Sequence, residues 1–419
     1  MAFARKLHSY PLHRAAVAGL SFGAIIVGAR LLPTGTFSAL MTAAFLAKFL
    51  QMLNFGATSG YLVSRYTVEG PPQRYATGAE RRFLLYYLAQ MACLAATIIV
   101  VAAVWFAEYR IGAVAFLLLV PLYVLEPALR YRRNFSFSLS PEFLLTMALL
   151  AAQTAYLAGL PENRLIWVYF AAIAILGPVL LAVVMPRHID DWRGGTTVFR
   201  LRDYVQVVIA GIPVYLGSAL FLVASSADRL LLPLYGSEEQ VATYFLAYQL
   251  SVGAMIFVTA TNFVNSVDLG EARQNKMALN KSFVVGKLWT ATLVASVSYG
   301  GLVAGAFILE AAFLNDNFKG LGLLVALIGA GLACFFALGA ITPIVTYAHR
   351  QIPLTISMGL VAVVLLANNA LVYWNGLGVM WLAGGTAFAL TAHACFAARF
   401  TFAVLRDQNE LAISDNQHY

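Results

Sequence analysis

Long apolar stretches separated by short polar connections run along the whole chain. Each stretch has at least 18 residues, the length at which an α-helix crosses the hydrocarbon core of a bilayer. The stretches lie at residues 14–32, 36–64, 83–106, 111–129, 140–159, 165–186, 204–232, 240–266, 283–309, 320–347, 353–374 and 377–404. This pattern predicts an all-α polytopic membrane protein with about 12 transmembrane helices.

The chain repeats a short pattern at the start of each of its halves. Residues 30–33 read Arg-Leu-Leu-Pro and residues 45–48 read Phe-Leu-Ala-Lys. In the second half, residues 229–233 read Arg-Leu-Leu-Leu-Pro and residues 245–248 read Phe-Leu-Ala-Tyr. The two copies lie about 200 residues apart, which indicates an ancestral duplication of a half-molecule.

The duplication predicts the arrangement of the helices. Six spans per half is an even number, so both halves enter the membrane from the same face. We therefore expect two parallel six-helix bundles related by a pseudo-twofold axis along the membrane normal. The polar connection around Gly195 predicts an N-terminal bundle at 1–195 and a C-terminal bundle at 196–419, which ends in a short cytoplasmic tail.

The composition excludes most other classes of protein. Hydrophobic residues make up 61% of the chain and charged residues 11%, and the mean hydropathy is +0.78. No polar stretch is long enough for a catalytic or nucleotide-binding domain outside the membrane. The three cysteines, Cys93, Cys334 and Cys395, stand singly in apolar stretches, so we expect packing roles and no metal site. The chain is thus not expected to be an enzyme.

The basic residues predict the orientation in the membrane. Of the 27 Lys and Arg residues, 21 fall on one side of the predicted spans. An excess of positive charge in short loops marks the cytoplasmic side, so both termini are predicted to be cytoplasmic. The net charge of +8 then suits the anionic cytoplasmic leaflet, and no nucleic-acid motif is present.

Ionisable residues inside the spans are the candidates for function. A charge near the bilayer centre costs about 2.5–3.5 kcal/mol on insertion scales, so it needs a partner, water or a ligand. Lys48 lies about twelve residues into the second span, near mid-depth. We predict that it faces an aqueous cavity inside the bundle. The alternative is a structural salt bridge to Glu126 or Glu142.

The second half offers a different set at the same place. Asp228 and Arg229 are adjacent, hence about 100° apart on a helix, and are expected to face different neighbours, one of them the cavity. For Arg229, and likewise for Arg30 in the first half, the alternative is snorkelling to the outer headgroups. Tyr248 and Gln249 occupy the position of Lys48, which predicts an aromatic and amide wall opposite a cationic one.

Two further features have a structural and a functional interpretation. His393 in the last span is either a hydrogen-bonded core histidine, which we favour, or a proton relay. The pairs Gly56/Gly60 and Gly301/Gly305 have the four-residue spacing that allows helices to approach closely, and packing is the expected role.

Two segments lie at the start of the second half: residues 225–232, which read Ser-Ser-Ala-Asp-Arg-Leu-Leu-Leu, and residues 237–250. They resemble the same region in polysaccharide-repeat flippases of the Wzx type. These flippases belong to the multidrug/oligosaccharidyl-lipid/polysaccharide (MOP) exporter superfamily. Residues 28–32, 53–57 and 64–66 resemble the family's opening pair of helices, although the outer turn at 33–37 lacks the family's acidic-Tyr-Gly pattern.

The resemblance implies a flippase that moves an undecaprenyl-diphosphate-linked oligosaccharide repeat unit across the bacterial inner membrane. The product would feed polysaccharide biosynthesis: O-antigen, capsule or exopolysaccharide. Two bundles would rock around a central cationic cavity lined by the first, second, seventh and eighth helices. These carry Arg30, Lys48, Asp228, Arg229 and Tyr248. A polysaccharide polymerase and a chain-length regulator are the implied protein partners.

Energy coupling is a separate hypothesis. An H⁺ or Na⁺ gradient would drive uphill transport. If the coupling ion is H⁺, the candidate protonation sites are Asp228, Glu126 and His393. No cofactor is implied. The alternative in the same superfamily is a multidrug extruder, against which Lys48 argues because cationic drugs favour acidic cavities. A membrane glycosyltransferase or polymerase would need catalytic carboxylates and a larger outer loop. A lipid II flippase would usually have two further helices.

Overall fold

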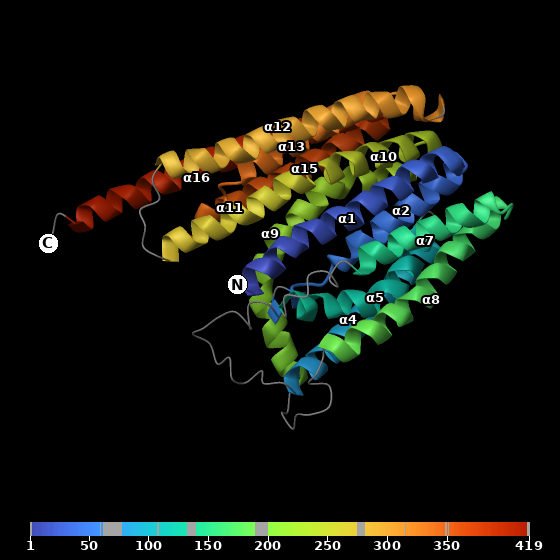
Figure 1. The fold of residues 1–419 in the computed structure, drawn as a ribbon, viewed down its shortest axis with the longest axis horizontal. Coiled ribbons are helices and arrows are strands. Elements are labelled where there is room, and N and C mark those ends of the chain that lie inside the picture. Colours follow the sequence, from blue (N-terminus) through green and yellow to red (C-terminus); the bar gives the residue numbers. More distant parts are fainter. Residues whose placement is uncertain are drawn as a thin grey trace. The chain divides into compact units, whose positions relative to one another are not determined.

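The computed structural model of the chain is built from helices, with no strand among the residues that it describes (Figure 1). These residues are 2–58, 60–61, 78–106, 109–131, 140–188, 200–274, 281–314, 316–347, 350 and 352–416. Each range predicted as a span contains a helix. In the described parts, eight helices are long and apolar enough to cross a membrane. The chain is a multi-pass membrane protein, and the total of 12 crossings stays a prediction.

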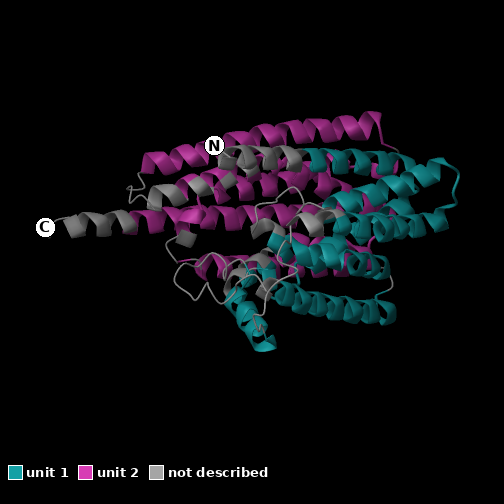
Figure 2. Cartoon of the chain, turned by 60° about the horizontal axis from the view of Figure 1, so that its bottom comes forward, with its two compact units in different colours: residues 1–222 teal, residues 223–419 magenta. Residues whose placement is uncertain are grey.

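The chain divides into two compact units, residues 1–222 and 223–419 (Figure 2). The change of unit falls within helix α9 (Leu201–Leu231). The boundary predicted near Gly195 lies outside the described residues, so that domain division stays a prediction.

The first unit is organised around one central helix. Helix α5 packs against α2, α4 and α8, while α7 packs against α1 and α8. These helices are α1 (Ala2–Leu31), α2 (Thr34–Gln51), α4 (Gly78–Val104), α5 (Arg110–Tyr131), α7 (Ser140–Leu157) and α8 (Glu162–His188). Gly112 lets α5 approach α2, because a Cβ there would stand 2.7 Å from the Cβ of Leu46. Phe116, Leu119 and Tyr123 of α5 are almost fully buried, so this helix forms the centre of the core.

The second unit repeats this order of packing. Helix α13 packs against α10, α12 and α16, and α15 packs against α16. The helices that follow α9 are α10 (Glu238–Ala254), α11 (Ile256–Gln274), α12 (Lys281–Ala312), α13 (Leu321–Gly339), α14 (Pro343–Tyr347), α15 (Ile352–Asn375) and α16 (Val379–Asn416). At Gly331 a Cβ would stand 2.6 Å from the Cα of Ala387, so α13 and α16 are in close contact. The repeated packing supports a duplication, and the twofold axis stays a prediction.

The two predicted glycine pairs behave differently. Gly56 and Gly60 lie against the backbone of α9 around Gly211, so closely that a Cβ on Gly60 or Gly211 would collide with the facing chain. Their predicted packing role is confirmed. Gly301 and Gly305 have no heavy atom of the described residues within 4 Å of a Cβ position, so the packing role predicted for them was wrong.

The second predicted span of each half is interrupted partway along its length. Helix α2 ends at Gln51, and Phe55 and Gly56 then turn the chain with φ values of 51° and 93°. Helix α10 ends at Ala254, and α11 begins at Ile256. The apolar pattern runs through both breaks, so hydropathy alone gave a single stretch in each case. The break sets the position of Lys48, which lies in the last turn of α2.

Candidate functional site

The polar residues of the first unit gather where α2, α5 and α7 meet. The ammonium group of Lys48 lies 3.2 Å from Oε1 of Glu142, and the two side chains are 37% and 39% exposed. Lys48 is in the last turn of α2 and Glu142 in the first turn of α7. Each charge therefore also complements the dipole of its own helix end. The salt bridge that the sequence left as the alternative for Lys48 is confirmed for Glu142.

A second carboxylate is bound by Gln51, which follows Lys48 by one helical turn of α2. The side-chain amide of Gln51 donates a hydrogen bond to the carboxylate of Glu126, which α5 holds in a buried position. Tyr123 precedes Glu126 by three residues, so it shares that face of α5, and its buried hydroxyl has no hydrogen-bond partner in the described part of the chain. The site thus contains one cation, two carboxylates and neutral hydrogen-bonding groups. Such a set can bind an anion at Lys48, or hold a proton or a cation between the carboxylates.

Arg30 occupies the last turn of α1, where its side chain is exposed. Helix α1 is held to α7 by the amide of Gln153, which donates to the carbonyl oxygen of Ala24 over 2.6 Å. Gly28 provides space for this amide, because a Cβ there would stand 2.8 Å from it. Arg30 is therefore an accessible cation at the end of a firmly packed helix.

Asp228 is the centre of a buried network in the second unit. Only 2% of it is exposed. Its carboxylate accepts hydrogen bonds from the backbone N–H of Arg229 at 2.8 Å, from the hydroxyl of Tyr244, and from the hydroxyl of Thr386 at 3.2 Å. The network ties α9 to α10 and α16. Nothing in the sequence pointed to Thr386, which lies 158 residues away from Asp228.

Arg229 is buried beside Asp228, and both side chains contact helix α10, Asp228 through Tyr244 and Arg229 through Tyr248. Its guanidinium carbon lies 3.4 Å from the centroid of the Tyr248 ring, in cation–π contact. One terminal nitrogen donates to the carbonyl oxygen of Ser225 at 2.8 Å and to the hydroxyl of Ser226 at 3.2 Å. The snorkelling alternative does not fit a residue that is only 7% exposed. Gln249, the next residue after Tyr248, is half-buried.

His393 is a buried histidine of α16. Its Nδ1 lies 2.9 Å from the hydroxyl oxygen of Ser357, and its ring stacks on Phe335 with centroids 5.9 Å apart. The favoured prediction, a hydrogen-bonded core histidine, is confirmed by this contact. Its role as a proton relay stays a prediction.

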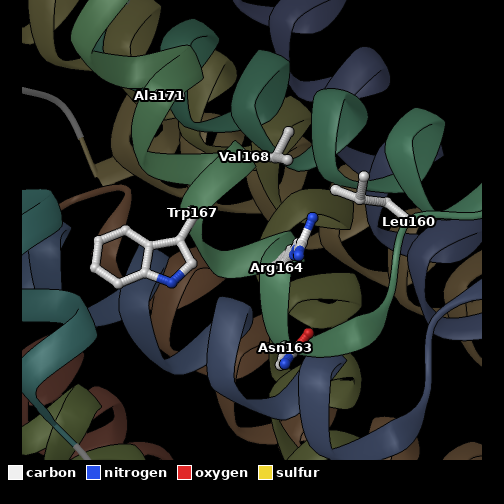
Figure 3. Close-up of a pocket in the computed structure, with 6 residues that line it drawn as sticks. All are labelled: Leu160, Asn163, Arg164, Trp167, Val168 and Ala171. Carbon is white, nitrogen blue, oxygen red and sulfur yellow. The ribbon is translucent and has the colours of Figure 1, made fainter.

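A shallow hollow of about 610 Å³ lies at the start of α8 (Figure 3). It is lined by Leu160, Asn163, Arg164, Trp167, Val168 and Ala171. All six come from α8 and the connection just before it. An exposed tryptophan and an arginine near a helix end are typical of the membrane–water interface. We interpret the hollow as part of an interfacial anchor.

Comparison with known proteins relates the fold to one group of transporters. No protein-family profile and no curated protein matches the sequence. Among solved structures, an inward-facing multidrug resistance MATE family transporter of the MOP superfamily aligns with 97% of this chain and 99% of its own, with a TM-score of 0.61 and 14% identity. The lipid II flippase MurJ, in an inward closed conformation, aligns with 93% of this chain and 86% of its own, with a TM-score of 0.71 and 12% identity.

A third similar structure is a MOP superfamily transporter from Pyrococcus furiosus, described as having a binding pocket of reverse polarity. It aligns with 96% of this chain and 95% of its own, with a TM-score of 0.55 and 12% identity. The likeness to these structures establishes the fold: the chain has the fold of MOP superfamily transporters. Within that superfamily the similar structures include both multidrug exporters and a lipid-linked flippase.

Proposed function

We propose that the chain is a flippase for an undecaprenyl-diphosphate-linked oligosaccharide in the bacterial inner membrane, with both termini cytoplasmic. The observation that carries the proposal is the fold, which resembles a lipid II flippase over 93% of the chain. The sequence resemblance to polysaccharide-repeat flippases adds to it. Alternating access between the two halves would move the headgroup, while the lipid tail stays in the bilayer. A polymerase and a chain-length regulator are the proposed partners.

Lys48 is the residue that we expect to meet the diphosphate. Its salt bridge to Glu142 is more than a third exposed, and exposed ion pairs contribute only about 0.2–1 kcal/mol. An incoming phosphate can therefore displace the carboxylate at little cost. Arg30, which is exposed, is the second proposed phosphate contact. Asp228, Arg229 and Tyr248, which are buried, would act by holding their helices, and Gln249 is proposed to contact the glycan.

Coupling to an ion gradient is the least supported part of the proposal. Glu126, Asp228 and His393 are the proposed protonation sites, and Na⁺ is the alternative coupling ion. A membrane potential would add about 2.3 kcal/mol per charge for each 100 mV. Flipping that is unchanged after collapse of both the pH gradient and the potential would remove this part.

A multidrug extruder is the second candidate, and one observation favours it. Glu126 and Glu142 place two carboxylates near Lys48, so the cluster is more acidic than the sequence suggested. A cluster of this charge suits an organic cation as well as a phosphate. The MATE family fold, with a TM-score of 0.61, fits this candidate too.

The test compares flipping in proteoliposomes that contain wild type, Lys48→Ala or Lys48→Arg. The substrate is undecaprenyl-diphosphate oligosaccharide, and accessibility of the glycan to an impermeant glycosidase reports its leaflet. We expect Lys48→Ala to lower the rate at least tenfold and Lys48→Arg to retain most of it, because a guanidinium also binds phosphate. Lys287→Ala is the matched control, since Lys287 forms an ion pair with Asp268 elsewhere in the chain.

The outcomes separate the two candidates. If wild type does not flip the lipid and instead transports a cationic dye in a manner that requires Glu142, the extruder replaces the flippase. If Lys48→Ala flips the lipid as fast as Lys287→Ala, Lys48 is not the phosphate contact.

A further inference from the structure

A cavity of about 220 Å³ lies within the second unit, and neither Asp228 nor Arg229 lines it. Its walls come from α11, α13, α15 and α16 and from the turn between α13 and α14. Asn262, His393 and Thr342 provide its polar groups, and Phe335 and Phe336 provide aromatic surface. The cavity is separate from every residue that we have proposed to contact the transported substrate.

Asn262 presents an acceptor that lacks a partner. Its amide nitrogen donates to the backbone carbonyl of Phe336 over 2.7 Å. That contact fixes the orientation of the amide, because two facing carbonyl oxygens would repel each other. The amide oxygen is buried and has no hydrogen-bond partner among the described residues. A buried acceptor of this kind favours a ligand that brings an N–H or O–H group.

The other two polar residues of the lining, Thr342 and His393, each already form a hydrogen bond within the protein. The hydroxyl of Thr342 donates to the carbonyl oxygen of Gly339 over 2.7 Å, which leaves its oxygen as an acceptor. Nδ1 of His393 is paired with Ser357, and the imidazole stacks on Phe335 at an interplanar angle of 27°. Among the residues that the structure describes, the lining holds no carboxylate, ammonium or guanidinium group. An ion would lose its hydration here without a counter-charge, so a neutral ligand is favoured.

The size and shape of the cavity narrow the class of ligand. An engineered cavity of about 150 Å³ holds benzene, so 220 Å³ suits a ring system somewhat larger than one benzene ring. Phe335 and Phe336 offer ring faces and edges for stacking, and Ala394 and Ala397 leave a flat wall on α16.

We propose that this cavity is a binding site for a small neutral ring compound with one N–H or O–H donor, which hydrogen-bonds to Oδ1 of Asn262 and packs against Phe335. The site shares no residue with the proposed phosphate contacts, and His393 is the residue of its lining that we have also proposed as a protonation site. A ligand there would contact four helices of the second unit together.

The experiment uses the full chain in nanodiscs and two fluorinated probes, 5-fluoroindole and 5-fluoro-1-methylindole. The second probe has the same ring but lacks the N–H donor. Ligand-observed fluorine NMR gives the dissociation constants. For wild type we expect the N–H probe to bind about tenfold more tightly than the methylated probe, as for one hydrogen bond to a buried acceptor.

Asn262→Leu keeps the branched shape of the side chain and removes the acceptor together with the donor to Phe336, so we expect it to abolish the preference for the N–H probe. Asn375→Leu makes the same change at an exposed position of α15 and should keep the tenfold preference. Equal binding of both probes to wild type, or an unchanged preference in Asn262→Leu, would overturn the proposal. If both probes only partition into the lipid, to the same extent for every variant, the result counts as equal binding and overturns the proposal. The wild-type comparison decides the matter even if Asn262→Leu does not fold.

Discussion

The two halves of the chain share a repeat but use its polar positions in opposite ways. In the first half, Lys48 is more than a third exposed and pairs with a carboxylate from another helix. At the same position of the second half, Tyr248 is buried beneath the guanidinium of Arg229. Arg30, the counterpart of Arg229, is exposed. At the repeated positions, the first half therefore exposes its cations, Arg30 and Lys48, whereas the second half buries Arg229.

The residue before each arginine offers a physical explanation of the difference. Asp228 precedes Arg229, whereas Ala29 precedes Arg30. A carboxylate with three hydrogen-bond donors around it allows the adjacent arginine to be buried, since an isolated charge would lose its hydration. Without that acid, the arginine of the first half stays accessible. The same repeated position can thus hold a buried arginine that joins helices in one half and an accessible arginine in the other.

The largest effect is expected from Asp228→Ala. The change leaves Arg229 buried without its carboxylate neighbour and removes the acceptor of Tyr244 and Thr386. Leaving a buried charge without a compensating charge nearby costs about 3–5 kcal/mol of the free energy of unfolding. Thermal unfolding of the detergent-solubilised protein measures it. Asp316→Ala, which breaks an exposed pair with Lys319, is the control, and an equal loss in both would contradict a structural role for Asp228.

An intermediate effect is expected from Tyr248→Leu. The variant loses the cation–π contact with Arg229, which contributes about 2 kcal/mol at a desolvated site. Tyr248→Phe keeps the ring but removes the hydrogen bond between the Tyr248 hydroxyl and Ser225, so it should lose about 1 kcal/mol. Chemical denaturation in mixed micelles gives both values. If Phe destabilises as much as Leu does, the hydroxyl, and not the ring, is what Arg229 needs.

The smallest effect on stability is expected at the exposed pair of the first half. A double-mutant cycle with Lys48→Ala and Glu142→Ala should give a coupling of about 0.2–1 kcal/mol that falls as salt is added. Unfolding of the four proteins at two ionic strengths measures it. A coupling of 3 kcal/mol or more that does not depend on salt would make the pair structural and would remove Lys48 as a displaceable phosphate contact.

The sequence was sufficient for the class of protein and for the polar residues of interest. The apolar stretches located a helix in every predicted range, since hydropathy reports directly on which segments can leave water. Lys48, Glu126 and Glu142 were found because ionisable groups in apolar segments are rare. The choice between a cavity lysine and a salt bridge stayed open, because it depends on which helix packs beside α2.

Other features were out of reach of the sequence for a common physical reason. The break after Gln51 follows from two residues with positive φ, and an apolar pattern carries no record of backbone torsion. The failure of the Gly301/Gly305 prediction has the same origin, since spacing permits a close contact but only a neighbouring helix makes one.

The sequence by itself determined a multi-pass helical protein with a short pattern repeated in its two halves and a few charges within its apolar segments. Only the tertiary structure decided that Asp228 is held by Thr386, that Lys48 meets Glu142, and that Asn262 faces a cavity. Those contacts join residues that are far apart in the chain, and side-chain burial and pairing are set by packing between helices. Local sequence fixes which segments are helical, because the bilayer leaves the backbone no other partner for its hydrogen bonds.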